Sequence, residues 1–473
     1  MAWWGIAAAS GSEYNKRWEE FAADELRDAV ANARRATEAA LERLNGATPV
    51  EAALVRSLAQ RYQSSQAASL DELRDWNDAY AASMREVYAA SPRDPDVVAI
   101  FAEAMLNRTP WQLWDLKSGE PAPGADTLEA VAVLERLMTE RGNEPHPGVV
   151  HMYIHAMEMS PHPERALRAS DALRDLATDA GHFLHMPSHI DIQCGDYHAA
   201  LVANEKAIAA DRKYLEREGP LNFYTLSRTH NYHFKLYAAM FLGQYGPALD
   251  AANELIATIP DELLRVTTPP MADWLEGFVG MKVHALVRFG RWDEIIAEPL
   301  PGDPELYRVT TAMLHYAKGL AHAARGRIDA AEAEQQLFAE AFARVPSSGC
   351  AMRWRCRTAC PMTSRGAGCS RSGMRWGRCS WSRVGSRKRQ RCIGLTWGWT
   401  PRSVGRPSTR TTSGACTGTW SVSTGSASTR ERRPCRGGST LRRLGPTWRS
   451  ARPASAGWET AVTVLAISPL HAR

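Results

Sequence analysis

Cysteine is nearly absent from the first 349 residues of this 473-residue chain, where Cys194 is the only one. A disulfide framework, a four-cysteine zinc site and an iron–sulfur cluster are therefore excluded there, and we expect Cys194 to be a small buried residue. No apolar run approaches the roughly 20 residues of a membrane helix, and no signal peptide is recognisable. We therefore expect a cytoplasmic protein with no membrane contact.

Acidic residues are nearly absent from the other end of the chain. Residues 351–473 contain 23 Arg and one Lys against Glu431 and Glu459, a formal charge of +22; because the whole chain carries +5, residues 1–350 carry −17. A basic tail is typical of nucleic-acid binding. A shifted reading frame explains it differently, because the codons for CIGLTWGWTP (392–401), read in the other frame, can encode YRADLGLDP, which is typical helix text.

The segments at 357–371 and 410–420 give helical text in the same shifted frame. We therefore interpret residues 347–473 as a frameshifted, disordered, non-folding tail with no nucleic-acid partner and no role for its cysteines. The alternative is a genuine disordered basic tail.

Strand-like alternation is also absent before residue 346, and the text there reads as helices. WEEFAADELRDAVANARRATEAALERL (18–44) has apolar residues at the 3.6-residue period of amphipathic helices. Helices are expected to stop at 45–49, 91–96 and 118–126, where Gly and Pro end one helix and Asp or Thr can cap the next. The first residues, MAWWGIAAASG, resemble the first helix of a repeat that has no preceding cap or partner helix, so we expect that an upstream portion is missing. The predicted fold class is all-α.

One phrase recurs four times, as GDYHAAL (195–201), GQYGPAL (243–249), GRWDEII (290–296) and GRIDAAE (326–332). The spacings are 48, 47 and 36 residues, the last close to the roughly 34 of a tetratricopeptide repeat. The phrase resembles the tetratricopeptide family, with a Gly expected to let two helices cross closely and an aromatic residue to fill the wedge between them. This resemblance implies a solenoid of helical hairpins. We divide it into degenerate hairpins at 1–130 and histidine-rich repeats at 131–346.

Ten of the fourteen histidines lie between His146 and His233. They form groups with helical spacing, which places the members of a group on one side of a helix. The groups are His151 and His155 with Glu158, then His182, His185 and His189, then His230 and His233. In the middle group Pro187 bends or ends the helix, and Ser188 can cap the next one. If the groups lie on first helices of adjacent repeats, they face one concave groove.

Imidazole suits Zn, Cu, Fe or Ni, so these groups predict one transition-metal ion, Zn, Cu or Fe. The candidate ligands are His151, His155, Glu158, His182, His185, His189, His230 and His233. The candidate partners of these ligands, or groove residues, are Asn204, Glu205 and Asn231. The alternative is a hydrogen-bonded polar groove without metal. The segments HMPSH (185–189) and HNYHF (230–234) resemble a bacterial subgroup of tetratricopeptide proteins, and this resemblance implies no activity.

Two functions fit these patterns. The first is a repeat protein that binds a protein segment or small ligand in a concave histidine-rich groove, with a transition-metal site. The second is a metal-dependent enzyme in which Glu158 is a further ligand or general base and open positions admit water or substrate. No reaction or catalytic residue is indicated, because residues 1–350 lack G-x-S-x-G, Walker A and G-x-G-x-x-G motifs.

Overall fold

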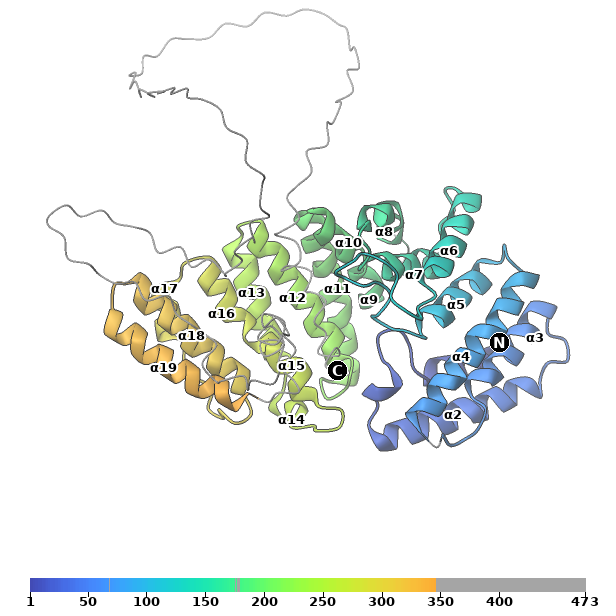
Figure 1. The fold of residues 1–473 in the computed structure, drawn as a ribbon, viewed down its shortest axis with the longest axis horizontal. Helices are drawn as coiled ribbons and strands as arrows, with labels where there is room; N and C mark the ends of the chain where they lie inside the picture. The colour runs from blue at the N-terminus through green and yellow to red at the C-terminus, as the bar shows by residue number, and fades with distance from the viewer. Residues whose placement is uncertain (68, 175, 177–178, 346–473) are drawn as a thin grey trace, which may run out of the picture. The chain divides into compact units, whose positions relative to one another are not determined.

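The computed structural model describes residues 1–67, 69–174, 176 and 179–345. Every regular element in this part of the chain is a helix (Figure 1), and two isolated backbone bridges, at Glu13 with Lys16 and Trp114 with Pro121, do not extend into strands. The predicted all-α class is confirmed. The tail predicted to be frameshifted, 347–473, lies outside the described residues.

The helices follow one another with short connections. The elements before residue 175 are α1 (Ala2–Ser10), η1 (Trp18–Glu20), α2 (Ala23–Leu41), α3 (Pro49–Arg61), α4 (Leu70–Ala90), α5 (Pro95–Leu106), α6 (Thr127–Arg141), α7 (Pro147–Met157), η2 (Pro163–Ala166) and α8 (Leu167–Leu173). The later elements are α9 (Gly181–His185), α10 (Pro187–Cys194), α11 (Tyr197–Glu218), α12 (Thr225–Phe241), α13 (Tyr245–Ala257), α14 (Asp261–Leu264), α15 (Met271–Val279), α16 (Met281–Arg288), α17 (Trp292–Ala297), α18 (Arg308–Ala324) and α19 (Ile328–Arg344).

The predicted breaks at 45–49 and 91–96 lie within a few residues of a helix end and a helix start, whereas at the third, 118–126, α6 begins next at Thr127 but α5 has already ended at Leu106. Thr48 caps α3 with its hydroxyl, which accepts a hydrogen bond from the Glu51 backbone at 3.2 Å, and the Glu51 carboxylate accepts one from the Thr48 backbone at 2.8 Å. Asp94 caps α5 in the same way, accepting from the Val97 backbone at 3.2 Å. These caps satisfy backbone donors that have no partner inside the helix, so the breaks are set locally.

The four repeated phrases form the turns of helical hairpins, in agreement with the predicted solenoid of hairpins. They join α10 to α11, α12 to α13, α16 to α17 and α18 to α19, and each pair is in contact (Figure 1). The expected reason for the glycine was wrong. Gly195, Gly243, Gly290 and Gly326 all have positive φ, from 65° to 86°. An added Cβ would meet nothing within 4 Å at three of them, so backbone conformation and not close helix crossing requires the glycine.

The aromatic residue of the phrase does pack between helices. Tyr197 stacks on Phe241 with ring centroids 4.6 Å apart, and Tyr245 contacts Phe289 at 5.3 Å. Cys194, which ends α10, is exposed, so its predicted burial was wrong. The turn leaves this side chain in solvent because the chain reverses direction at Gly195.

One apolar core extends from α1 to α10, and α7 lies inside it. Every residue of α7 from Val149 to Met157 is buried, which is the pattern of a helix enclosed on all sides. Its histidines are therefore carried into the interior by apolar neighbours. None of the helices in the described part of the chain is both long and apolar enough to cross a membrane. The proposed boundary near residue 130 stays a prediction.

Candidate metal centre

Four helices bring seven of the predicted residues together. α7 carries His151 and His155 one turn apart, and Glu158 follows its last residue. The other histidines come from three later helices, His182 and His185 from α9, His189 from α10 and His230 from α12. Because α10 contacts α7 and α9 contacts α12, these side chains meet in the interior.

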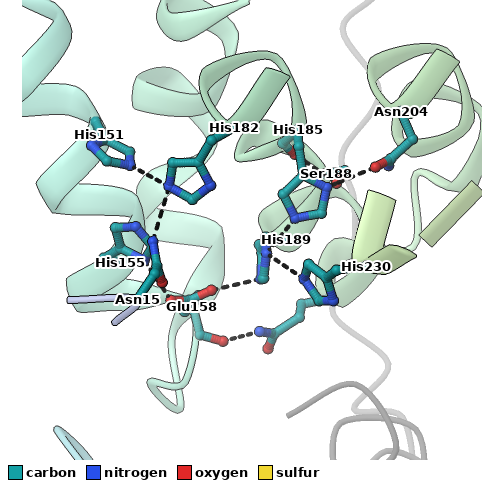
Figure 2. A network of polar contacts seen from close by, with 11 residues as sticks. Asn15, His151, His155, Glu158, His182, His185, Ser188, His189, Asn204 and His230 are labelled. Atoms are coloured by element: carbon teal, nitrogen blue, oxygen red, sulfur yellow. Dashed lines mark hydrogen bonds and ion pairs between the residues drawn. The ribbon is translucent and has the colours of Figure 1, made fainter. Parts of the chain in front are cut away.

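The first triad consists of His151, His155 and His182, each of which offers one nitrogen within 4.8 Å of the others. Nε2 of His151 lies 3.0 Å from Nε2 of His182 (Figure 2). Nε2 of His155 is buried and has no hydrogen-bond partner among the described residues. A buried, unpaired ring nitrogen is costly in a protein interior. This position therefore suits a ligand.

The second triad consists of His185, His189 and His230, whose nitrogens also lie within 4.8 Å of one another. Nε2 of His189 lies 2.8 Å from Nε2 of His185 and 3.4 Å from Nε2 of His230. Three nitrogens bound to one ion at about 2.0 Å lie roughly 3.5 Å apart in a plane. To reach that spacing, the measured pairs need to change by about 0.5 Å at His151–His182, about 0.7 Å at His185–His189 and about 0.1 Å at His189–His230. One ion was expected, and the structure offers two separate sets of ligands.

Glu158 connects the two triads. Its Oε1 lies 2.9 Å from Nδ1 of His155, and its Oε2 lies 2.6 Å from Nδ1 of His189 (Figure 2). Burial by itself raises the pKa of this carboxyl, but His189 and His155 outweigh it and hold the pKa well below its usual range. Glu158 is therefore ionised, and both facing Nδ1 atoms carry hydrogen. Each of its oxygens faces a histidine of a different triad. This arrangement favours a role in orienting those histidines over the predicted role as a metal ligand or general base.

Asn204 fixes the proton of His185. The Asn204 amide nitrogen donates to the Ala200 carbonyl at 2.8 Å, so its oxygen is the atom that faces Nδ1 of His185, at 2.7 Å. Ser188 was expected to cap α10, but its hydroxyl donates instead to the His185 carbonyl at 2.6 Å. The backbone is already helical at Met186, and the His189 backbone donates to the Met186 carbonyl at 3.2 Å, so Ser188 does not cap α10. Nδ1 of His185 is therefore a donor.

The proton positions leave two lone pairs facing each other. His185 and His189 each use Nδ1–H toward an oxygen, so Nε2 of each neutral ring is an acceptor. These two acceptors lie 2.8 Å apart. Two neutral rings in these orientations cannot hydrogen-bond to each other through Nε2, and burial lowers the pKa of His185 well below its ordinary value. A cation between the two nitrogens removes this conflict.

Aromatic side chains pack around both triads. Phe234 lies 4.5 to 4.7 Å from all three rings of the second triad, and Phe183 stacks on His151 at 4.5 Å. Tyr14 lies 4.5 Å from His155. Burial, followed by the neighbouring imidazoles, lowers the pKa of His182 to about 3. His182 is therefore neutral at ordinary pH, the form in which histidine binds metals.

The N-terminal segment supplies a contact that no sequence pattern predicted. The side-chain amide nitrogen of Asn15 lies 3.2 Å from Nε2 of His182, across 167 positions of sequence. The neighbouring Tyr14 also packs on Trp111 at 5.2 Å, and Trp111 has a φ of 61°, unusual for a residue other than glycine. Asn15 and Tyr14 lie between α1 and η1, outside any helix, so helical spacing could not identify them.

Three predicted residues lie apart from the triads. His233 is buried beside Phe278 of α15, with ring centroids 5.4 Å apart. Glu205 is exposed and forms an ion pair with Lys235 at 3.4 Å. The remaining one is Asn231, whose amide donates to Asp211 at 2.7 Å.

No protein-family model matches this chain, and no curated protein matches it. Among solved structures it is similar to a tetratricopeptide repeat protein from Parabacteroides merdae, with a TM-score of 0.28 and 14% sequence identity. The similarity covers 57% of this chain and 88% of that one. A likeness of this extent does not establish a family, and the description of the fold therefore stands on the helical hairpins themselves.

Proposed function

We propose that this helical array is a metal-binding protein whose function depends on transition-metal ions held by the two histidine triads. The close approach of Nε2 of His185 to Nε2 of His189 carries the proposal, since the two atoms lie 2.8 Å apart and both are acceptors when the rings are neutral. The unpaired Nε2 of His155 supports it at the first triad. Histidines that lined an open peptide groove would need exposure, whereas His155 and His185 are each only 1% exposed.

The ligand set limits the choice of metal. Imidazole nitrogens suit Zn, Cu, Fe or Ni, and divalent affinity rises toward copper across the series. Each ion would be oriented by partners of its ligands, Glu158 in both triads and Asn204 in the second. Such partners set the ring orientation and raise ligand basicity.

A metal-dependent enzyme is the second candidate. Three protein ligands leave a fourth position of a tetrahedral ion for water or substrate, which is the pattern of catalytic zinc sites. The two triads of this chain have that count of ligands. The binding of a protein segment or small ligand by the array stays a prediction.

Metal analysis of the full chain tests the proposal. The protein is purified without a histidine tag or chelators, and metal is counted by inductively coupled plasma mass spectrometry. We expect at least one equivalent, lost when His155→Ala and His185→Ala are combined. His162→Ala is the matched control, because His162 is 65% exposed and outside the triads. A trace of metal that the double variant retains unchanged would overturn the proposal.

A further inference from the structure

The charges around the triads are few and unequal. Metal-binding histidines are neutral ligands, so the six rings contribute no charge. Among the described residues, Glu158 is the one carboxylate in contact with a histidine of either triad. Its negative charge is also the one that acts on both His182 and His185. The ligands and their contacts therefore supply a single negative charge for both centres.

The single negative charge of Glu158 limits which metal ions the triads can bind. Glu158 is 2% exposed and His151, His155 and His185 are buried, while the other three histidines are partly exposed, so water compensates only part of any excess charge. Uncompensated charge in a protein interior is strongly unfavourable. Two monovalent ions leave one net positive charge, and so does one divalent ion. Two divalent ions leave three.

The two triads are also close enough to repel each other's ions. The rings of His182 and His185, one from each triad, have centroids 6.5 Å apart. Glu158 touches one ligand of each triad, so its charge is shared and cannot neutralise both ions fully. Repulsion between ions at such separations is weakly screened when water is excluded.

We propose that the paired triads select their occupants by total charge, taking two cuprous ions or a single divalent ion. A second divalent ion would enter only with an accompanying anion. This inference rests on the proposed metal-binding function. Cuprous ions accept trigonal nitrogen coordination, and a triad of imidazoles provides it. The softness of the ligands does not explain a preference for cuprous ions, because the described ligands include no thiolate or thioether and imidazole binds several metals.

Two titrations of the metal-free full chain test the inference. Cu(I) is added under anaerobic conditions against a chromophoric competitor, and Zn(II) is added in a buffer free of coordinating anions. We expect two equivalents of Cu(I) of similar affinity but one tight equivalent of Zn(II), with the second at least a hundredfold weaker. Added azide should strengthen the second Zn(II) equivalent. Two Zn(II) equivalents of equal affinity without azide would overturn the inference.

A variant of Glu158 tests whether its carboxylate supplies the negative charge that the bound ions require. Glu158→Gln keeps the shape of the side chain but removes its charge, so we expect the second Cu(I) equivalent to weaken at least tenfold. Glu205→Gln is the matched control, because that exposed carboxylate pairs with Lys235 and contacts neither triad. Unchanged Cu(I) binding in Glu158→Gln would contradict the inference. The wild-type titrations stand even if this variant does not fold.

The two proposals fail differently. If neither ion binds, or if His155→Ala with His185→Ala binds as wild type does, the metal-binding function is wrong. If Zn(II) fills both triads as readily as Cu(I), that function stands and selection by charge is wrong.

Discussion

Gly181 is the residue whose substitution should disturb both triads without removing a ligand. It begins α9, and a Cβ added there would lie 2.8 Å from Cγ of Asp211 and 3.0 Å from the Tyr224 hydroxyl. Asp211 cannot easily turn away, because it accepts hydrogen bonds from Tyr224 at 2.8 Å and from Asn231 at 2.7 Å. The start of α9 must therefore move in Gly181→Ala. Ordinary carbon contacts of about 3.5 Å require a shift of about 0.7 Å or more.

The shift has two measurable consequences. Overpacking of this kind destabilises a protein by about 1–3 kcal/mol. α9 also carries His182 and His185, one ligand of each triad, so both centres should lose geometry together. Disturbed ligand orientation typically weakens metal binding about 10- to 100-fold. Chemical unfolding of the metal-free protein and competitive metal titration measure the two effects separately.

Gly277→Ala is the matched control, because a Cβ there would meet nothing within 4 Å in the middle of α15. A second comparison uses Gly181→Ala with Asp211→Ala, in which the obstructing carboxylate is gone and part of the metal affinity should return. If Gly181→Ala matches wild type in both stability and affinity, Asp211 does not position α9. If it destabilises without any effect on binding, α9 does not transmit the shift to the ligands.

Three further predictions address single features. Asn204→Ala should weaken binding about 10- to 100-fold at the second triad only, because it frees the His185 ring; equal weakening of both equivalents would contradict this. Gly243→Ala should lower the free energy of unfolding by about 1 kcal/mol because the φ of Gly243 is 70°, whereas Gly246→Ala should raise it by about 0.5–1 kcal/mol because Gly246 lies inside α13 with open space around it. Thermal unfolding measures both changes, and shifts of the same sign would be inconsistent with these conformations. Burial, helped by His284, lowers the pKa of His233 from 6.5 to about 4, so His233 alone should contribute a fall of roughly 3 kcal/mol in the free energy of unfolding of the metal-free protein as pH drops from 6.5 to 4. His233→Phe should remove that part of the pH dependence in urea titrations.

The helices and their ends could be predicted from sequence because their causes are local. Thr48 and Asp94 cap helices through bonds to backbone groups two or three residues away, and prolines follow both at the first helical position. The repeated glycines mark hairpin turns, although their reason is a positive φ and not close packing. Such features depend on a few neighbouring residues, and a sequence displays them directly.

The membership of the triads could not be predicted. The sequence grouped His182, His185 and His189 by their spacing, but the structure assigns His182 to the α7 histidines and the other two to α12. The split falls within α9, between His182 and His185, whereas His185 and His189 stay together across Pro187. Spacing along one helix does not tell which neighbouring helix each side chain meets. His233 was grouped with His230 for the same reason and lies among apolar residues instead.

The sequence by itself determined that histidines would gather on helices of an all-α array, since helical periodicity is a property of neighbouring residues. Only the tertiary structure decided that they form two triads, that Glu158 lies between His155 and His189, and that Asn15 contacts His182 across 167 positions of sequence. Those contacts depend on how helices pack, and packing is set by the shapes of side chains far apart in the chain.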